Sequence, residues 1–301
     1  MLKNSSIKIL VLITALPYFG LFGQQDLFMP RNIQSAYEEG TRSLNGEPGE
    51  NYWQNSSDYK IKVEVNPQEK ILTGLEEITY YNNSPDTLGR IVLRLYQDIF
   101  KKGNARDFSV TGEAINEGVQ IKYISIHNIP VDIDDVKVFR QEGTNVFIKL
   151  DEPIPPESEI DLYVEWSFII PSKVKLRMGA YDSTSFFIAY WYPQIAVYDD
   201  IDGWDTHNYG GYQEMYNDFS NFEVEVTVPN TFAVWGTGKL ENVEQILQKK
   251  YLDRFYAAEN ADIVISIIDT IDLKTGKIFI DDKEKNIWKF STTTLLILPS
   301  L

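Results

Sequence analysis

The chain has no cysteine, so only histidines and carboxylates could hold a metal ion. The candidates are its two histidines and a run of aspartates. A catalytic zinc site usually has three protein ligands, and two of them are often histidines close together on one helix. Here His127 and His207 are 80 residues apart, and no His-Glu-x-x-His occurs. We expect His127 on the polar face of a strand and His207 in a loop, so the sequence predicts no metal site in this chain.

The aspartate run is Asp199-Asp200-Ile201-Asp202-Gly203-Trp204-Asp205. Clustered carboxylates beside a glycine can bind calcium, but this spacing lacks the bidentate glutamate and the helices of an EF-hand. A solvated, turn-rich loop is the simpler interpretation. Glycine-rich phosphate loops and serine-nucleophile elbows are also absent from the sequence.

The charge of the chain excludes one class of partner. The formal net charge is −16 in 301 residues, and removal of Lys3 and Lys8 would make it −18. Such a surface repels phosphate backbones and anionic lipid, so we expect no nucleic-acid partner. The charge could attract basic peptides, or it could simply keep an exported protein soluble.

The first 23 residues have the layout of a secretory signal peptide, with Lys3 and Lys8 before an apolar run at 9–22. This run is shorter than the ~20 residues of a membrane-spanning helix, although an uncleaved anchor is the alternative. Cleavage after Gly23 would leave no membrane span and a periplasmic or extracellular protein. Residues 24–50 are polar and predict a flexible lead-in with a short helix near 33–39.

Most of the remaining chain predicts β-structure. Tyr59, Ile61, Val63 and Val65 alternate with polar residues, which is the pattern of a half-buried strand. Similar patterns predict further strands, with turns at residues 66–69 and 82–86 and an interruption by Pro153. The expected strands are at residues 71–81, 90–96, 119–126, 136–139, 146–150, 160–166, 222–228, 262–268 and 277–280.

One amphipathic helix is predicted at residues 241–258, with Asn242 and Gln245 as a capping box. The fold class is therefore mainly β, a large antiparallel structure with one clear helix. Residues 291–301 carry no charge and follow a highly charged stretch, so we treat them as an atypical tail. They are either a natural C-terminal strand or the product of a frameshifted reading frame.

Several stretches, in order, resemble the N-terminal domain of the aminopeptidase N family of zinc metallopeptidases. The strand patterns around Gly74 carry part of the likeness, and the form Trp-Tyr-Pro-x-x-x-Val-Tyr-Asp-Asp from Trp191 is closest to exported bacterial members. The resemblance covers residues 51–290. Its segments are residues 59–81, 91–96, 150–165, 190–200 and 221–229.

The resemblance implies a saddle-like β-sandwich that covers a catalytic domain and helps to hold the free amino terminus of a peptide substrate. The family pattern Gln-x-Glu before proline falls here on Tyr190 and Tyr192, so the amine-binding carboxylate is not carried over. Tyr190, Tyr192 and the nearby Gln194 remain the candidate substrate-binding residues. An ordinary β-core is the alternative role for this aromatic cluster.

The catalytic parts of that family are missing from these 301 residues, namely Gly-x-Met-Glu-Asn, His-Glu-x-x-His and the downstream glutamate. We therefore expect no catalytic residue, no cofactor and no peptidase activity from this chain alone. Complete relatives would remove N-terminal residues from peptides, using zinc-activated water and a glutamate base. The alternative is a stand-alone exported module that binds peptide or glycan through Trp191, Tyr192, Tyr198 and Trp204.

Overall fold

Alternation of apolar and polar residues builds the long strands, as the sequence predicts. In β1 (Ser56–Asn66) every second side chain from Ser57 to Val65 is buried, and the intervening residues face solvent or the sheet margin. β2 (Ile71–Asn82) repeats this pattern, with Leu72, Ile78 and Tyr80 on its buried side. The two strands form a hairpin, because Asn66 Oδ1 accepts hydrogen bonds from the amides of Gln68 and Glu69 in the turn.

The computed structural model describes residues 28–172, 174, 177–275, 277–280 and 283–295. It divides into two compact units, Met1–Tyr52 and Trp53–Leu301. The signal peptide expected at residues 1–23 lies outside the described residues. In the first unit, the helix expected near residues 33–39 is confirmed as α2 (Arg31–Glu38). None of the helices in the described ranges is long and apolar enough to cross a membrane.

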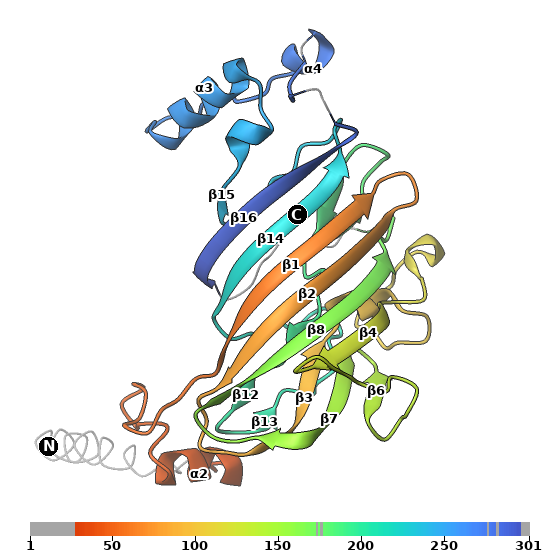
Figure 1. Cartoon of the computed structure of the whole chain (residues 1–301). Helices are drawn as coiled ribbons and strands as arrows, with labels where there is room; N and C mark the ends of the chain where they lie inside the picture. Colours follow the sequence, from red (N-terminus) through yellow and green to blue (C-terminus); the bar gives the residue numbers. More distant parts are fainter. Residues whose placement is uncertain (1–27, 173, 175–176, 276, 281–282, 296–301) are drawn as a thin grey trace, which may run out of the picture. The chain divides into compact units, whose positions relative to one another are not determined.

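The second unit is mainly β, which confirms the predicted fold class. Its larger sheet has eight strands in the order β15-β16-β14-β1-β2-β8-β4-β5 (Figure 1). One feature differs from the all-antiparallel expectation, because β1 and β14 pair in parallel. Hydrophobic alternation determines which face of a strand is buried, but it does not determine whether the strand pairs with its neighbour in parallel or antiparallel. The other strands of this sheet are β4 (Gln120–Ile126), β5 (Ile129–Pro130), β8 (Ser158–Ile169), β14 (Ser220–Pro229), β15 (Lys239–Leu240) and β16 (Lys285–Leu295).

A second sheet of four antiparallel strands, β11-β3-β7-β6, shares one hydrophobic core with the larger sheet. Ile91 and Leu93 of β3 and Ile148 of β7 contribute fully buried side chains to this core. This arrangement of two sheets around common side chains is a β-sandwich. The strands of the second sheet are β3 (Leu88–Arg94), β6 (Phe139–Glu142), β7 (Asn145–Ile154) and β11 (Gln194–Ile195).

Several strand boundaries differ from the prediction, among them those of β6 and β7. The strand expected at residues 136–139 begins only at Phe139, because Asp135 O accepts the amides of Val138 and Phe139 in a preceding turn. The strand expected at residues 146–150 continues through Pro153 to Ile154 as β7. Proline is tolerated near the end of a strand where no ladder hydrogen bond requires its amide.

The helix predicted at residues 241–258 is wrong in its first half. A 3₁₀ turn at Val243–Gln245 is followed by extended residues, and the helix α3 spans Lys249–Glu259. The break has a clear cause, because Ile280 N donates to Ile246 O and Gln248 N donates to Ile278 O. Asn242 makes no capping hydrogen bond and instead bridges the β16 backbone, donating to Ile287 O and accepting from Lys289 N.

Residues 262–268 and 277–280 do not form the predicted strands. The second segment makes a single bridge, Leu247 to Phe279, beside the extended stretch before α3. The first segment has no strand partner among the described residues, and its Val264 is 99% exposed. An apolar run needs a neighbouring edge to become a strand, and this is a tertiary condition. A short helix, α4 (Asp272–Thr275), lies between the two segments.

The first residues of the charge-free stretch at 291–301 belong to the larger sheet. β16 runs through Ser291 to Leu295, with Ser291 opposite Glu223 of β14 and Lys239 of β15. Residues 296–301 lie outside the described part of the chain.

Gly74 of β2 lies directly opposite Trp166 of β8, and the indole lies over the position where a side chain would be. A Cβ added at Gly74 would lie 2.5 Å from the nearest indole atom. We expect Gly74→Ala to lower the free energy of unfolding by about 1–3 kcal/mol, because a packed core cannot absorb the added methyl group. Urea denaturation measures this change. Gly89→Ala is the matched control, because nothing lies within 4 Å of its added Cβ; an equal loss in both variants would contradict the packing argument.

Candidate functional site

The three candidate substrate-binding residues are all buried. Tyr192 is 3% exposed, and its ring makes edge contacts with Tyr59, Trp191 and Phe222 at centroid distances of 5.4, 5.2 and 5.7 Å. Tyr59 in turn stacks on Phe222 at 5.0 Å. These rings fill the space between the two sheets, as the ordinary-core alternative expects. The substrate-binding role of Tyr192 stays a prediction.

Tyr190 occupies a different cluster and has an uncommon backbone conformation. Its φ is +53°, a left-handed value that is rare for bulky residues and often marks a functional constraint. The ring makes an edge contact with Tyr96 at 5.8 Å, and the hydroxyl accepts a hydrogen bond from Arg177 Nη1 at 2.9 Å. Tyr190 and Tyr192 therefore belong to separate clusters, although two residues apart in sequence.

Gln194 begins β11 and pairs with Arg94 of β3. Its side chain is buried, and within the described chain its Nε2 atom has no hydrogen-bond partner. The next residue is fixed to the larger sheet, since Ile195 N donates to Tyr59 Oη at 3.0 Å. An unpaired buried donor costs free energy, so this amide is a feature that ordinary packing does not explain.

Sequence reasoning missed Glu76, the most unusual buried group in the structure. It is fully buried on β2, and both carboxylate oxygens lack a hydrogen-bond partner among the described residues. Burial raises the pKa of Glu76 well above its usual range, and Tyr59 also has a raised pKa, from burial first and from Glu76 second. A signal existed in the sequence, because Glu76 has the same strand parity as Leu72, Ile78 and Tyr80.

The aromatic surface proposed for a stand-alone binding module is largely inside the protein. Trp191, Tyr192 and Trp204 are 1%, 3% and 7% exposed, and Tyr198 is partly exposed. Tyr198 packs on Trp204 at a centroid distance of 5.3 Å and donates a hydrogen bond to Asp86 Oδ2.

The aspartate run at residues 199–205 forms a small hairpin of β12 (Tyr198–Asp199) and β13 (Gly203–Trp204). Asp199 Oδ1 accepts the amides of Ile201 and Asp202, which is the role of an aspartate in a turn. Asp205 instead pairs with the buried Arg94 at 3.7 Å. The described residues contain no group of three or more acidic, histidine or cysteine side chains arranged to hold a metal ion.

The two histidines lie in separate turns and loops. His127 is not on the face of a strand as expected, because it forms the β4–β5 turn with Asn128. Both residues have positive φ, +48° and +64°, as the two central positions of a type I′ hairpin require. His207 lies in a loop as expected, with Nδ1 3.4 Å from Asp205 Oδ1. The side chains in the described ranges do not fit a zinc site.

Asp218 is a further carboxyl group with a raised pKa. Burial raises its pKa to about 7, while the hydrogen bond from Gln54 Nε2 lowers it and the charge of Asp199 raises it further. Asp218 also contributes to the raised pKa of Tyr80, after burial itself. This partly buried carboxyl lies between the aspartate hairpin and the start of β14, outside the three predicted residues.

Comparison with known proteins gives partial structural similarity only. No protein-family model and no curated protein matches the chain. Among solved structures, an M1 zinc metallopeptidase from Deinococcus radiodurans is 13% identical, with a TM-score of 0.39 over 81% of this chain and 40% of that one. A mutant of it bound to a Tyr-Ser-Ala substrate gives 0.40, and a two-domain M1 zinc metallopeptidase mutant bound to L-arginine gives 0.38 at 14% identity. The chain spans about 40% of the length of these structures, and we transfer no residue role from them.

Glu76→Gln tests the buried carboxyl without changing its size. The folded state holds the Glu76 proton at pH values where the unfolded state has lost it, so wild-type stability falls as pH rises above the unfolded pKa of about 4.3. We expect the variant to lose less stability than the wild type between pH 5 and pH 9. Thermal unfolding at each pH measures this difference. The exposed neighbour Glu77→Gln is the control, and parallel pH profiles for wild type and Glu76→Gln would refute the raised pKa.

Asp218 gives a second, independent titration. With a folded pKa of about 7 and an unfolded pKa of about 3.9, its contribution to stability falls as pH rises through that interval and is constant above it. NMR of ¹³C-labelled protein should show one carboxyl resonance with a midpoint near pH 7 that is lost in Asp218→Asn. A midpoint near 4 for that resonance would contradict the effect of burial.

Proposed function

We propose that this chain is the non-catalytic N-terminal β domain of an exported, aminopeptidase N-like zinc metallopeptidase. One observation carries the proposal: the sequence segments that resemble that family fall on the strands that build the shared core. Residues 59–81 are β1 and β2, residues 91–96 lie mainly in β3, and residues 221–229 lie in β14. Residues 150–165 include the end of β7 and most of β8, and residues 190–200 supply β11 and the buried rings.

An exposed apolar surface supports a role for this domain beside another one. Val264, Ile263 and Leu273 are 99%, 76% and 68% exposed, and Trp235 is 54% exposed. A cavity of about 380 Å³ is lined by Trp235, Leu273 and Ile265, the residue after Val264, together with five other apolar residues and Thr231. Contiguous exposed apolar surface commonly marks a protein interface. We propose that a catalytic domain packs here, and that the zinc ligands and the glutamate base belong to that domain.

The substrate of the complete protein would be a peptide with a free amino terminus. In this proposal the segment from Tyr190 to Gln194 lies on the side of the domain that meets the substrate, and Tyr190, Tyr192 and Gln194 support that side. Because these three side chains are buried, their role in the proposal is to stabilise the β-structure. A substrate would contact the backbone of this segment, or its side chains after they rearrange.

Export is part of the same proposal. The positive residues Lys3 and Lys8, the apolar run and Gly23 support cleavage and release into the periplasm or the extracellular space. A stand-alone exported module that binds peptide or glycan stays the alternative prediction.

One experiment tests the domain proposal, the export proposal and the alternative. The native protein is captured from the source cells with an antibody raised against this chain. Its N-terminal residue, its intact mass and its hydrolysis of aminoacyl-coumarin substrates are then measured. We expect Gln24 as the first residue, a mass well above the 34.7 kDa of this sequence, and activity that a zinc chelator abolishes.

A captured protein no larger than 34.7 kDa and without peptidase activity, from a gene with no His-Glu-x-x-His frame beyond the codon for Leu301, would refute the domain proposal and favour the stand-alone module. An N-terminus at Met1 would refute cleavage alone. Sequencing the DNA beyond the codon for Leu301 is the control, because a frame that encodes His-Glu-x-x-His there would identify a broken gene as the cause of a short product.

A further inference from the structure

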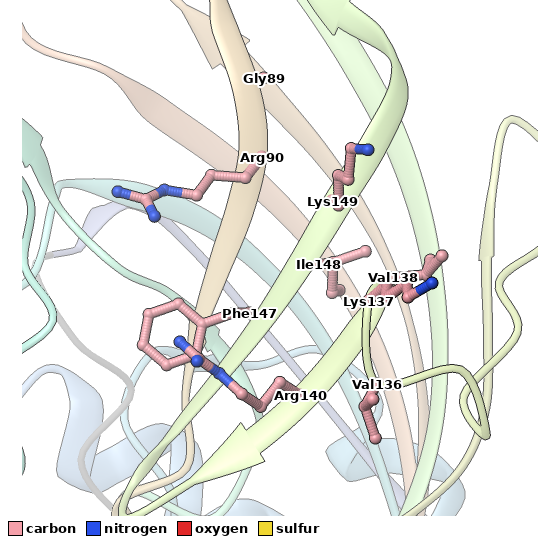
Figure 2. A pocket seen from close by; sticks show the side chains of 9 residues that line it. All are labelled: Gly89, Arg90, Val136, Lys137, Val138, Arg140, Phe147, Ile148 and Lys149. Carbon is pink, nitrogen blue, oxygen red and sulfur yellow. The ribbon is translucent and has the colours of Figure 1, made fainter.

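A basic pocket lies on the outer face of the four-stranded sheet, away from the buried rings. It has a volume of about 500 Å³, and β3, β6 and β7 supply its floor (Figure 2). Four of its nine lining residues are cationic, and none is acidic. The cations are Arg90, Lys137, Arg140 and Lys149.

The strand register brings these cations together. Arg90 of β3 is opposite Lys149 of β7, and Arg140 of β6 is opposite Phe147, two residues before Lys149. All four cationic side chains are exposed. The Cα atoms of Arg90 and Arg140 are expected about 12 Å apart, because their strands are separated by two spacings of ~4.8 Å and their positions are offset by two residues of ~3.4 Å each. This distance suits two acidic side chains on one extended ligand.

Three of the four cations have no ion-pair partner in the described part of the chain. Within the described residues, Arg90, Lys137 and Lys149 form no ion pair, whereas Arg140 Nε lies 3.4 Å from Glu142 Oε2. This concentration of free positive charge contrasts with a chain whose net charge is −16. Exposed cations that lie near one another and form no ion pair raise the local positive potential, and an anionic ligand would lower it.

The pocket also has apolar surface. Arg140 lies over the half-buried Phe147 ring, 4.8 Å from its centroid, and Figure 2 shows this stacked pair beside Arg90. Val136, which is 77% exposed, and Val138 complete the apolar lining. The Arg140 guanidinium lies over the ring, and its Nη1/Nη2 edge, away from the Nε that faces Glu142, can receive the two oxygens of a carboxylate.

We infer that this pocket binds a short acidic peptide segment, with two or more carboxylates beside an aliphatic or aromatic side chain. The carboxylates pair with Arg90, Arg140 and the two lysines, and the apolar side chain packs on Phe147 and Val136. This inference is independent of the proposed peptidase family, because it rests on the lining residues of one sheet face.

The charges around the pocket favour a short peptide over a long polyanion. Asp132, Asp134 and Asp135 precede Lys137 in sequence, and Asp151 and Glu152 follow Lys149. A nucleic acid or sulfated polysaccharide long enough to leave the pocket would meet these carboxylates and the acidic remainder of the surface. A peptide of about six residues can remain within the basic lining.

Fluorescence anisotropy with the full chain tests the inference. The probe is a labelled hexapeptide in which glutamate alternates with leucine and phenylalanine, and its partner has glutamine in place of each glutamate. We expect binding of the acidic peptide that weakens with salt, and binding at least about tenfold weaker for the glutamine peptide. The double variant Arg90→Glu/Lys149→Glu should weaken binding of the acidic peptide by at least about tenfold, since attraction becomes repulsion.

Lys102→Glu/Lys122→Glu is the matched control, because it makes the same charge change at exposed lysines that do not line the pocket. Circular dichroism checks that each variant is folded, and Lys137→Gln/Arg140→Gln provides the same test if the first variant is not. Equal binding of the two peptides, or equal loss in pocket and control variants, would overturn the inference. Tighter binding of heparin or a 20-nucleotide single-stranded DNA at this pocket would also overturn it, replacing the peptide with a long polyanion.

Discussion

The contact of Trp166 with the opposite sheet is the constraint on which the rest of the structure depends. Its indole lies over Gly74, stacks on Trp191 at a centroid distance of 6.5 Å, and donates a hydrogen bond to Trp191 O at 3.3 Å. These contacts bring the segment from Tyr190 to Ile195 between the sheets. The rings of this segment and the aliphatic side chains of both sheets fill the space between the sheets, so Tyr192 and Gln194, expected at a substrate surface, are buried.

The core between the two sheets also contains buried polar groups that ordinary packing would exclude. Glu76 has no hydrogen-bond partner in the described chain, and neither Trp191 Nε1 nor Gln194 Nε2 has one. Each such group costs about 1–3 kcal/mol when buried alone. A neutral Glu76 lowers this cost, because a protonated carboxyl avoids the much larger penalty of an isolated buried charge. The free-energy cost of burying Glu76 in the core therefore depends on pH.

Outside the core, charge and apolar surface are separated into distinct regions. The basic pocket lies on the face of β3, β6 and β7, whereas the exposed apolar residues lie around Trp235 and Val264. The first region suits a small anionic partner and the second a broad apolar one. The two surfaces share no lining residue. A domain with these two surfaces can join a larger protein and still bind a separate ligand.

The sequence by itself determined the mainly β fold, the faces of β1 and β2, and the helix near Arg31, because period-two alternation and local helix pattern are properties of neighbouring residues. Only the tertiary structure decided the parallel pairing of β1 with β14, the break before α3 and the absence of a strand at residues 262–268. Each of these depends on which edge or backbone group a distant segment meets. The same is true of the candidate sites. Glu76 and the cations of the basic pocket are ordinary residues of strand patterns until the register of two sheets determines which are buried and which gather on one face.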